Sequence, residues 1–119
     1  MKKLIDANVI LRYLLGDHPE YSKKAKEVIE EGAYTLPEVI AEVVYVLNGV
    51  YKVARSEIRD TLVDFMDEVD VDNGEIIALA LAVYSEISLD FVDCVLIAYH
   101  RIDRAEVVSF DKKLNKNLI

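Results

Sequence analysis

The chain has 119 residues and a formal net charge of −8, from 22 acidic and 14 basic side chains. Its length suits one domain, residues 1–119, and its excess of acid argues against non-specific binding of nucleic acid, which depends on cations that neutralise phosphates. The longest stretch without polar side chains, residues 76–84, is too short to cross a bilayer, so we expect no membrane association and a cytoplasmic protein.

Short apolar strands alternate with helical segments along the chain. Strands are expected over residues 2–6, 33–36 and 106–110, and helices over 7–15, 19–31, about 37–51, 57–68, 74–87 and 88–102. Pro19 and Pro37 suit the first turn of a helix, and Gly16 and Gly32 suit positions just after a helix ends. Ser56 and Asn73 are plausible N-caps of the helices that follow them. Strands separated by helices predict a parallel α/β sheet covered by helices on both faces.

Two acidic residues follow directly after predicted strands. Asp6 comes after the first strand, and Asp111 comes after "VVSF". The carboxyl ends of parallel strands are where open α/β sheets bind their ligands. Both side chains are therefore candidates for a functional site, although either could simply cap the turn or helix that follows it.

Two further acidic residues lie among apolar neighbours in predicted helices. Glu42 stands in "PEVIAEVVYVL" and Asp93 in "DFVDCVLIAY", each with apolar residues three and four positions away. Charged groups are rarely placed in an apolar stripe unless something compensates them. No lysine or arginine lies within one helical turn of Glu42, so a salt bridge along the helix is not the explanation there.

Four carboxylates that converge would repel one another, which raises the pKa of some of them. A hard divalent cation removes that repulsion, because Mg²⁺ and Mn²⁺ prefer carboxylate and water oxygens as ligands. A bound ion also lowers the pKa of a coordinated water. The pattern therefore predicts a Mg²⁺ or Mn²⁺ site.

The order and flanks of these four acids resemble the PIN-domain ribonucleases, in particular the VapC-type toxins of toxin-antitoxin pairs. The resemblance covers essentially the whole chain and rests on "LIDANVIL", "AEVVYVL", "DFVDCVLIAY" and "VVSFD". Ala7 departs from the Thr or Ser often found after the first acid, and Ser109 stands where Thr is frequent. Lys113 and Leu114 stand where the family often has an acid and an aromatic residue.

The resemblance implies a three-layer PIN-like fold with a parallel sheet of about five short strands. It also implies a Mg²⁺- or Mn²⁺-dependent endoribonuclease that cleaves single-stranded RNA, forms a homodimer and is neutralised by a cognate VapB-like antitoxin. Residues carried over as catalytic and metal-binding are Asp6, Glu42, Asp93 and Asp111, with Asn8, Asp90 and Ser109 as accessory positions. Asp90 can equally be an N-cap of the helix that carries Asp93.

Other functions share parts of this pattern. A receiver-type phosphoacceptor domain matches the length and the α/β alternation, but it expects adjacent acids after the first strand, where this chain has Asp6 and Ala7. Haloacid-dehalogenase-like phosphatases need an acid at the position of Asn8. A catalytically silent PIN-like domain that binds only protein is the remaining alternative.

Overall fold

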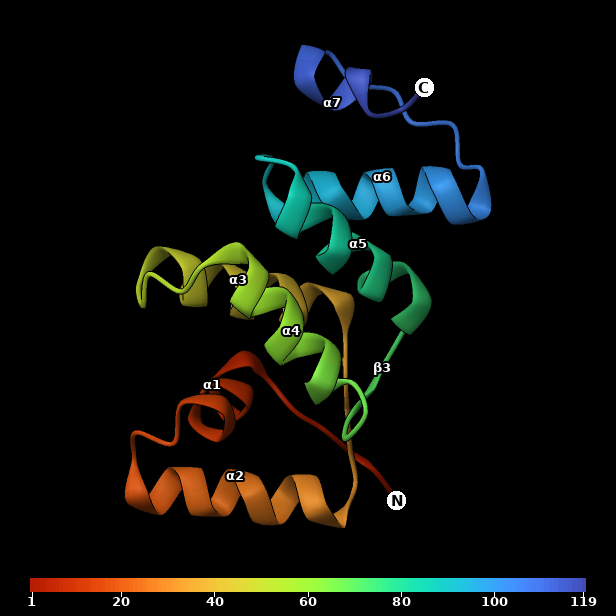
Figure 1. Ribbon diagram of the computed structural model, residues 1–119. Helices are drawn as coiled ribbons and strands as arrows, with labels where there is room; N and C mark the ends of the chain where they lie inside the picture. The colour runs from red at the N-terminus through yellow and green to blue at the C-terminus, as the bar shows by residue number, and fades with distance from the viewer.

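Three strands and seven helices follow one another along residues 1–119, all of which the computed structural model describes (Figure 1). The N-terminal half contains β1 (Lys3–Leu4), α1 (Ala7–Leu15), α2 (Pro19–Glu31), β2 (Ala33–Thr35) and α3 (Pro37–Gly49). The C-terminal half contains α4 (Arg55–Phe65), β3 (Asp70–Val71), α5 (Gly74–Glu86), α6 (Phe91–Asp103) and α7 (Lys112–Lys116).

The first two helices begin and end at residues that suit those positions. The Asp6 carboxylate accepts a hydrogen bond from the backbone N–H of Val9 and so caps α1, which ends at Gly16 in the left-handed conformation (φ 59°). His18 caps α2 through its ring Nδ1, which accepts from the backbone N–H of Tyr21 at 3.1 Å. Pro19 occupies the first position of that helix, as predicted.

The three strands form one parallel sheet in the order β1-β2-β3. Lys3 pairs with Ala33, and Tyr34 pairs with Asp70. The helices α1, α3 and α5 each begin within three residues of a strand's carboxyl end, so their first turns share one edge of the sheet. Thr35 is fully buried at this edge, and its hydroxyl donates a hydrogen bond of 2.8 Å to the carbonyl oxygen of Ile5, next to Asp6.

One cluster of 26 buried residues makes up the hydrophobic core. The helix α3 contributes four of them, Ile40, Val43, Val44 and Leu47. The helix α5 is apolar on nearly all sides and packs against both α4 and α6, which explains why its sequence carries no polar face (Figure 1). The apolar sequence of residues 76–87 suits either a central helix or a subunit interface, and the packing of α5 on α4 and α6 fits the first.

The sheet has three strands, so the expected number of about five is wrong. Residues 106–110 were predicted to form a strand but pair with none of the three, and the outer edge of β1 has no neighbour. The chain turns at Arg104, which is left-handed at φ 56°, and then runs toward α7 with Val108 and Phe110 exposed. Strand propensity alone does not make a strand, because the backbone groups need a partner strand within reach.

Several helix boundaries differ from those predicted. The helix α4 begins at Arg55, so Ser56 lies inside it rather than capping it, and α6 begins at Phe91 rather than near Ser88. Asn73 precedes α5 as expected, but its backbone is left-handed (φ 55°) and its side chain makes no capping hydrogen bond. The strand β3 and the helix α7 were not predicted, since each is too short to show a period.

The molecule is flat and elongated, with extents of 46 × 32 × 19 Å. The helices α1 and α2 lie at one end and α7 at the other, with α3 to α6 between them (Figure 1). None of the helices combines the length and the apolar character needed to span a membrane. Residues at the start of α1 are therefore well separated from residues at the start of α7.

We expect Thr35→Val to lower the free energy of unfolding by about 1–3 kcal/mol, because it leaves the Ile5 carbonyl oxygen without its buried donor. Thermal and urea denaturation measure the change. Thr61→Val, a half-buried position on α4, is the matched control and should change stability less. Equal stabilities of the two variants would show that this hydrogen bond does not hold the strand end in place.

Candidate active site

Asp6 occupies the predicted position at the carboxyl edge of the sheet. It is exposed, and its Oδ1 accepts from the backbone N–H of Val9 at 3.1 Å. Asn8 is also exposed in the first turn of α1. The hydrogen bond that orients Asp6 therefore comes from the backbone, and the Asn8 side chain is left to face solvent.

Glu42 lies on the exposed side of α3. The buried side of this helix carries Val43 and Val44, whereas Tyr45 is 77% exposed beside Glu42. The expectation that Glu42 is embedded in an apolar stripe is wrong, because some of its apolar neighbours in sequence are themselves exposed to solvent. An acid at this position has no desolvation penalty to compensate.

Asp93 is half-buried in the first turn of α6. Its pKa is raised above the ordinary value, first by burial and then by the negative charges of Asp90 and Asp111. Asp90 occupies the N-cap position of α6, but its side chain makes no capping hydrogen bond and remains exposed. The capping interpretation of Asp90 therefore applies to its backbone position and not to its carboxylate.

Asp111 begins α7 and caps it through Oδ1, which accepts from the backbone N–H of Leu114 at 2.8 Å. The Ser109 hydroxyl accepts from the Asp111 backbone N–H at 3.0 Å and so fixes the turn before the helix. The helix is held near the start of α6 by buried Leu114 and by Lys113, whose Nζ donates to the Ser88 carbonyl oxygen at 2.7 Å. Asp111 therefore lies near Asp93 although no strand precedes it.

The structure brings together some of the predicted site residues and not others. Asp90, Asp93 and Asp111 lie near enough for their charges to interact. No group of three or more His, Cys, Asp or Glu side chains is arranged to hold one metal ion. Carboxylate oxygens are the donors that Mg²⁺ and Mn²⁺ prefer, so the donor chemistry fits such an ion, but the arrangement in this fold does not.

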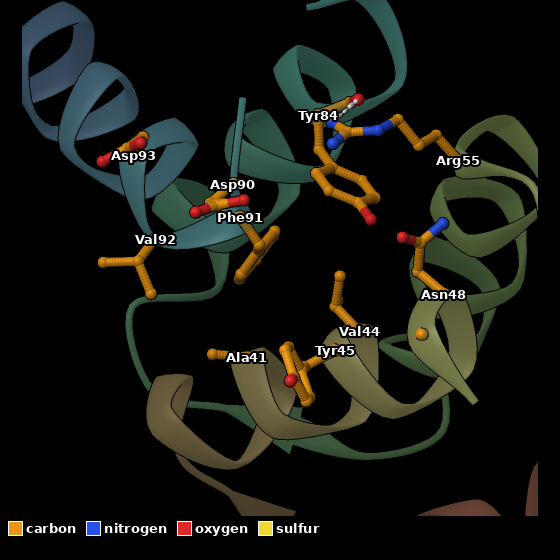
Figure 2. Close-up of a pocket in the computed structure, with 11 residues that line it drawn as sticks. Ala41, Val44, Tyr45, Asn48, Arg55, Tyr84, Asp90, Phe91, Val92 and Asp93 are labelled. Atoms are coloured by element: carbon orange, nitrogen blue, oxygen red, sulfur yellow. Dashed lines mark hydrogen bonds between the residues drawn. The ribbon is translucent and has the colours of Figure 1, made fainter. Parts of the chain in front are cut away.

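A cavity of about 390 Å³ lies beside Asp93, between α3 and the start of α6 (Figure 2). Its lining combines apolar and polar side chains. Ala41, Val44, Tyr45, Asn48 and Gly49 come from α3, Arg55 from α4, Tyr84 from α5, and Asp90, Phe91, Val92 and Asp93 from the start of α6. Asp90 and Asp93 form one edge of the opening, and Arg55 and Tyr84 lie on the opposite side (Figure 2).

Arg55 fixes the connection between α5 and α6. Its Nη1 donates to three carbonyl oxygens, those of Tyr84 at 3.1 Å, Ile87 at 3.0 Å and Leu89 at 2.7 Å. The guanidinium carbon also lies 4.0 Å from the centre of the Tyr84 ring. The first turn of α6, which carries Asp93, follows directly from this connection, so Arg55 positions it.

Sequence reasoning did not assign Arg55, Tyr84 or Asn48 to a site. One signal was present for Tyr84, since it brings a hydroxyl into a helix that is otherwise apolar on nearly all sides. No signal was present for Arg55, because the three carbonyl groups that it binds lie 29 to 34 residues away in the chain. Such contacts follow from packing alone.

Comparison with known proteins identifies the family to which this chain belongs. The family model described as "PIN domain" matches residues 3–117, and the chain therefore belongs to the PIN-domain family. A protein of Aquifex aeolicus (strain VF5) named "VapC ribonuclease" is 28% identical over 122 residues, which cover 96% of this chain and 90% of the relative. No solved structure matches the chain.

We expect Arg55→Met to lower the free energy of unfolding by about 2–3 kcal/mol, because three carbonyl oxygens lose a charged donor. Hydrogen exchange should also rise at the amides of residues 87–94. Arg101→Met, at an exposed position on α6, is the matched control. Unchanged exchange in residues 87–94 of Arg55→Met would contradict the positioning role.

The raised pKa of Asp93 predicts how stability depends on pH. The folded protein holds this proton more tightly than the unfolded chain, so the free energy of unfolding falls as pH rises from the ordinary pKa of 3.8 through the higher folded pKa. The variant Asp93→Asn does not lose stability in this way as the pH rises, because its amide does not ionise. Its melting temperature should match wild type near pH 3 and exceed it near pH 7.

Thermal denaturation across this pH range checks the expectation. Asp64→Asn, at an exposed position on α4, is the control. A variant Asp93→Asn that is equally or less stable than wild type at neutral pH would show that the charge of Asp93 is not destabilising in the folded protein.

Proposed function

We propose that the chain is an endoribonuclease of the VapC type that cleaves single-stranded RNA and acts as the toxin of a toxin-antitoxin pair. Its PIN-domain membership and its 28% identity to a VapC ribonuclease support this function. The single observation that carries it is the half-buried carboxylate of Asp93, with a raised pKa, beside two further acids and an open cavity. A ribonuclease requires a proton acceptor beside a surface that can bind the RNA strand.

Asp93 is proposed to act as the general base. A carboxylate with a raised pKa accepts a proton more readily than an ordinary one. In the proposed step a water oxygen forms a bond to phosphorus and its proton passes to a carboxylate oxygen of Asp93. One ester P–O bond breaks, the leaving oxygen takes up a proton from solvent to become a hydroxyl, and Asp93 returns its proton to solvent. Lys112 and Lys116, exposed beside Asp111, would bind phosphates of the RNA.

We further propose that cleavage requires Mg²⁺ or Mn²⁺ and that Asp6, Glu42, Asp93 and Asp111 are the catalytic acids. The support is the oxygen chemistry of these four side chains and their family pattern. As folded here, they do not form a metal site. The proposal therefore requires Asp6 and Glu42 to approach Asp93 and Asp111 when RNA binds, with Asn8, Asp90 and Ser109 as accessory positions.

The proposed partners are a second copy of the chain and a VapB-like antitoxin. Val108 is 82% exposed and Phe110 is fully exposed, although both are large apolar residues. Exposed apolar side chains of this kind are typical of surfaces that a protein partner covers. We place the homodimer contact at these two residues and propose that the protein acts in the cytoplasm.

The alternative is a catalytically silent PIN domain that binds only protein. It is favoured by one observation, the absence of a group of three acids arranged around one ion. The receiver-type function has no such support, since the PIN-domain match covers residues 3–117. Measured cleavage separates the two interpretations.

With Mn²⁺ or Mg²⁺, the wild-type protein should cut an unstructured RNA, and EDTA should stop the reaction. Asp93→Asn should lower the rate by at least about a hundredfold, the range for loss of a general base, without loss of folding. Asp64→Asn is the control and should cut at the wild-type rate. Sequencing of the cut ends locates the cleavage sites.

A well-folded wild-type protein that cuts no RNA would support the silent domain. Full activity of Asp93→Asn would refute the role of that residue. Cleavage that persists in EDTA would show that the reaction does not need the ion.

A further inference from the structure

The cavity beside Asp93 contains a tyrosine hydroxyl that has no hydrogen-bond partner within the protein. Tyr84 is only 3% exposed, and its carbonyl oxygen accepts from Arg55, but its hydroxyl makes no hydrogen bond within the chain. Figure 2 shows this hydroxyl directed into the open centre of the cavity. The hydroxyl is not among the side-chain atoms sealed from solvent without a partner, so it reaches the open cavity and is free to donate to a ligand that supplies an acceptor.

The protonation state of this hydroxyl defines what it can bind. Burial raises the pKa of Tyr84 above its ordinary value, and the opposing effect of the Arg55 cation is smaller. The hydroxyl therefore stays protonated at neutral pH and donates. On the neighbouring rim, Asn48 uses its Nδ2 to donate to the Val53 carbonyl oxygen at 3.1 Å, which leaves its Oδ1 free to accept.

The walls of the cavity are flat and apolar. Tyr84 and Phe91 pack edge to face with their ring centres 5.9 Å apart, and Val44 is buried beneath them. Tyr45 stands on the opposite wall with 77% of its surface exposed, so one face of its ring is available for stacking (Figure 2). A ligand that fits these walls is planar and carries donors and acceptors on its edge.

The charges around the cavity exclude other occupants. A phosphate or carboxylate would be repelled by Asp90 and Asp93 at the rim. A cationic side chain that entered the cavity would meet the guanidinium of Arg55 at its inner wall. A purely apolar side chain would leave the Tyr84 hydroxyl unsatisfied. A neutral, planar group with polar edges meets all three conditions.

We propose that this cavity binds one unpaired nucleobase of the RNA substrate, stacked on Tyr45 and hydrogen-bonded at its edge by Tyr84 and Asn48. Single-stranded RNA is recognised by unstacked bases that lie on aromatic side chains and are read along their edges. A cavity of about 390 Å³ has room for one nucleoside. Asp93 lines the same cavity, so a nucleobase bound there would hold the RNA strand beside the proposed general base.

This inference rests on the proposed function, since it assumes that RNA is the substrate, but binding is measured without cleavage. The probes are fluorescent heptamers of A, of C and of U, together with the ribose-phosphate heptamer without bases. The full chain is titrated in EDTA, and fluorescence anisotropy gives the dissociation constant.

At least one base-bearing heptamer should bind about tenfold or more tightly than the heptamer without bases, as expected for one stacked base. Tyr45→Ala should remove this difference. Tyr84→Phe, which deletes only the hydroxyl, should weaken binding and alter the preference among the three bases while leaving the melting temperature unchanged or higher. Tyr21→Ala on α2 and Tyr99→Phe on α6 are the matched controls.

Equal binding of heptamers with and without bases, or no binding of any base-bearing heptamer, would overturn the nucleobase pocket and leave a side chain of a protein partner as its occupant. So would base-dependent binding that survives Tyr45→Ala and Tyr84→Phe. Base-dependent binding by a protein that cuts no RNA would refute the nuclease while the pocket stands. Cleavage of RNA by a protein whose binding does not depend on the bases would refute the pocket and leave the nuclease function standing.

Discussion

The interaction on which the C-terminal half depends is the set of hydrogen bonds from Arg55 to three carbonyl oxygens. One of these carbonyls, that of Tyr84, lies in the last turn of α5, and the other two belong to the connection that follows. The donor is a cation, which the negative end of the helix dipole favours. Because α6 follows directly, the direction of its first turn is set by the same contact. The cavity and Asp93 therefore share one structural support, and both should respond when Arg55 is altered.

Burial and charge repulsion act together in the other half of the site. Burial, and then the negative charges of Asp90 and Asp111, raise the pKa of Asp93. Asp6 is held elsewhere by the backbone of α1, and Glu42 faces solvent on α3. Because Asp6 and Glu42 do not join the other three acids in one group, the fold avoids the full electrostatic penalty of bringing all five together. If the proposed assembly of the acids occurs, substrate or ion binding has to offset that penalty.

The proposed pocket explains how an acidic protein can use RNA. With a net charge of −8, the chain has little general attraction for phosphates, and its exposed lysines near Asp111 offer only local contacts. Stacking and edge hydrogen bonds act at short range and do not depend on net charge. Affinity that comes from a base rather than from the backbone also makes binding selective for unpaired regions, because a paired base cannot enter the cavity.

The α/β class and the span of most helices could be predicted from the sequence, because apolar periodicity, capping residues and glycines act over a few neighbouring positions. Asp6 was correctly placed after a strand on those grounds. The exposure of Glu42, the unpaired segment 106–110 and the carbonyl contacts of Arg55 were decided only by tertiary structure. Each depends on which distant surface a segment meets, and a strand or a buried charge exists only when another part of the chain supplies its partner.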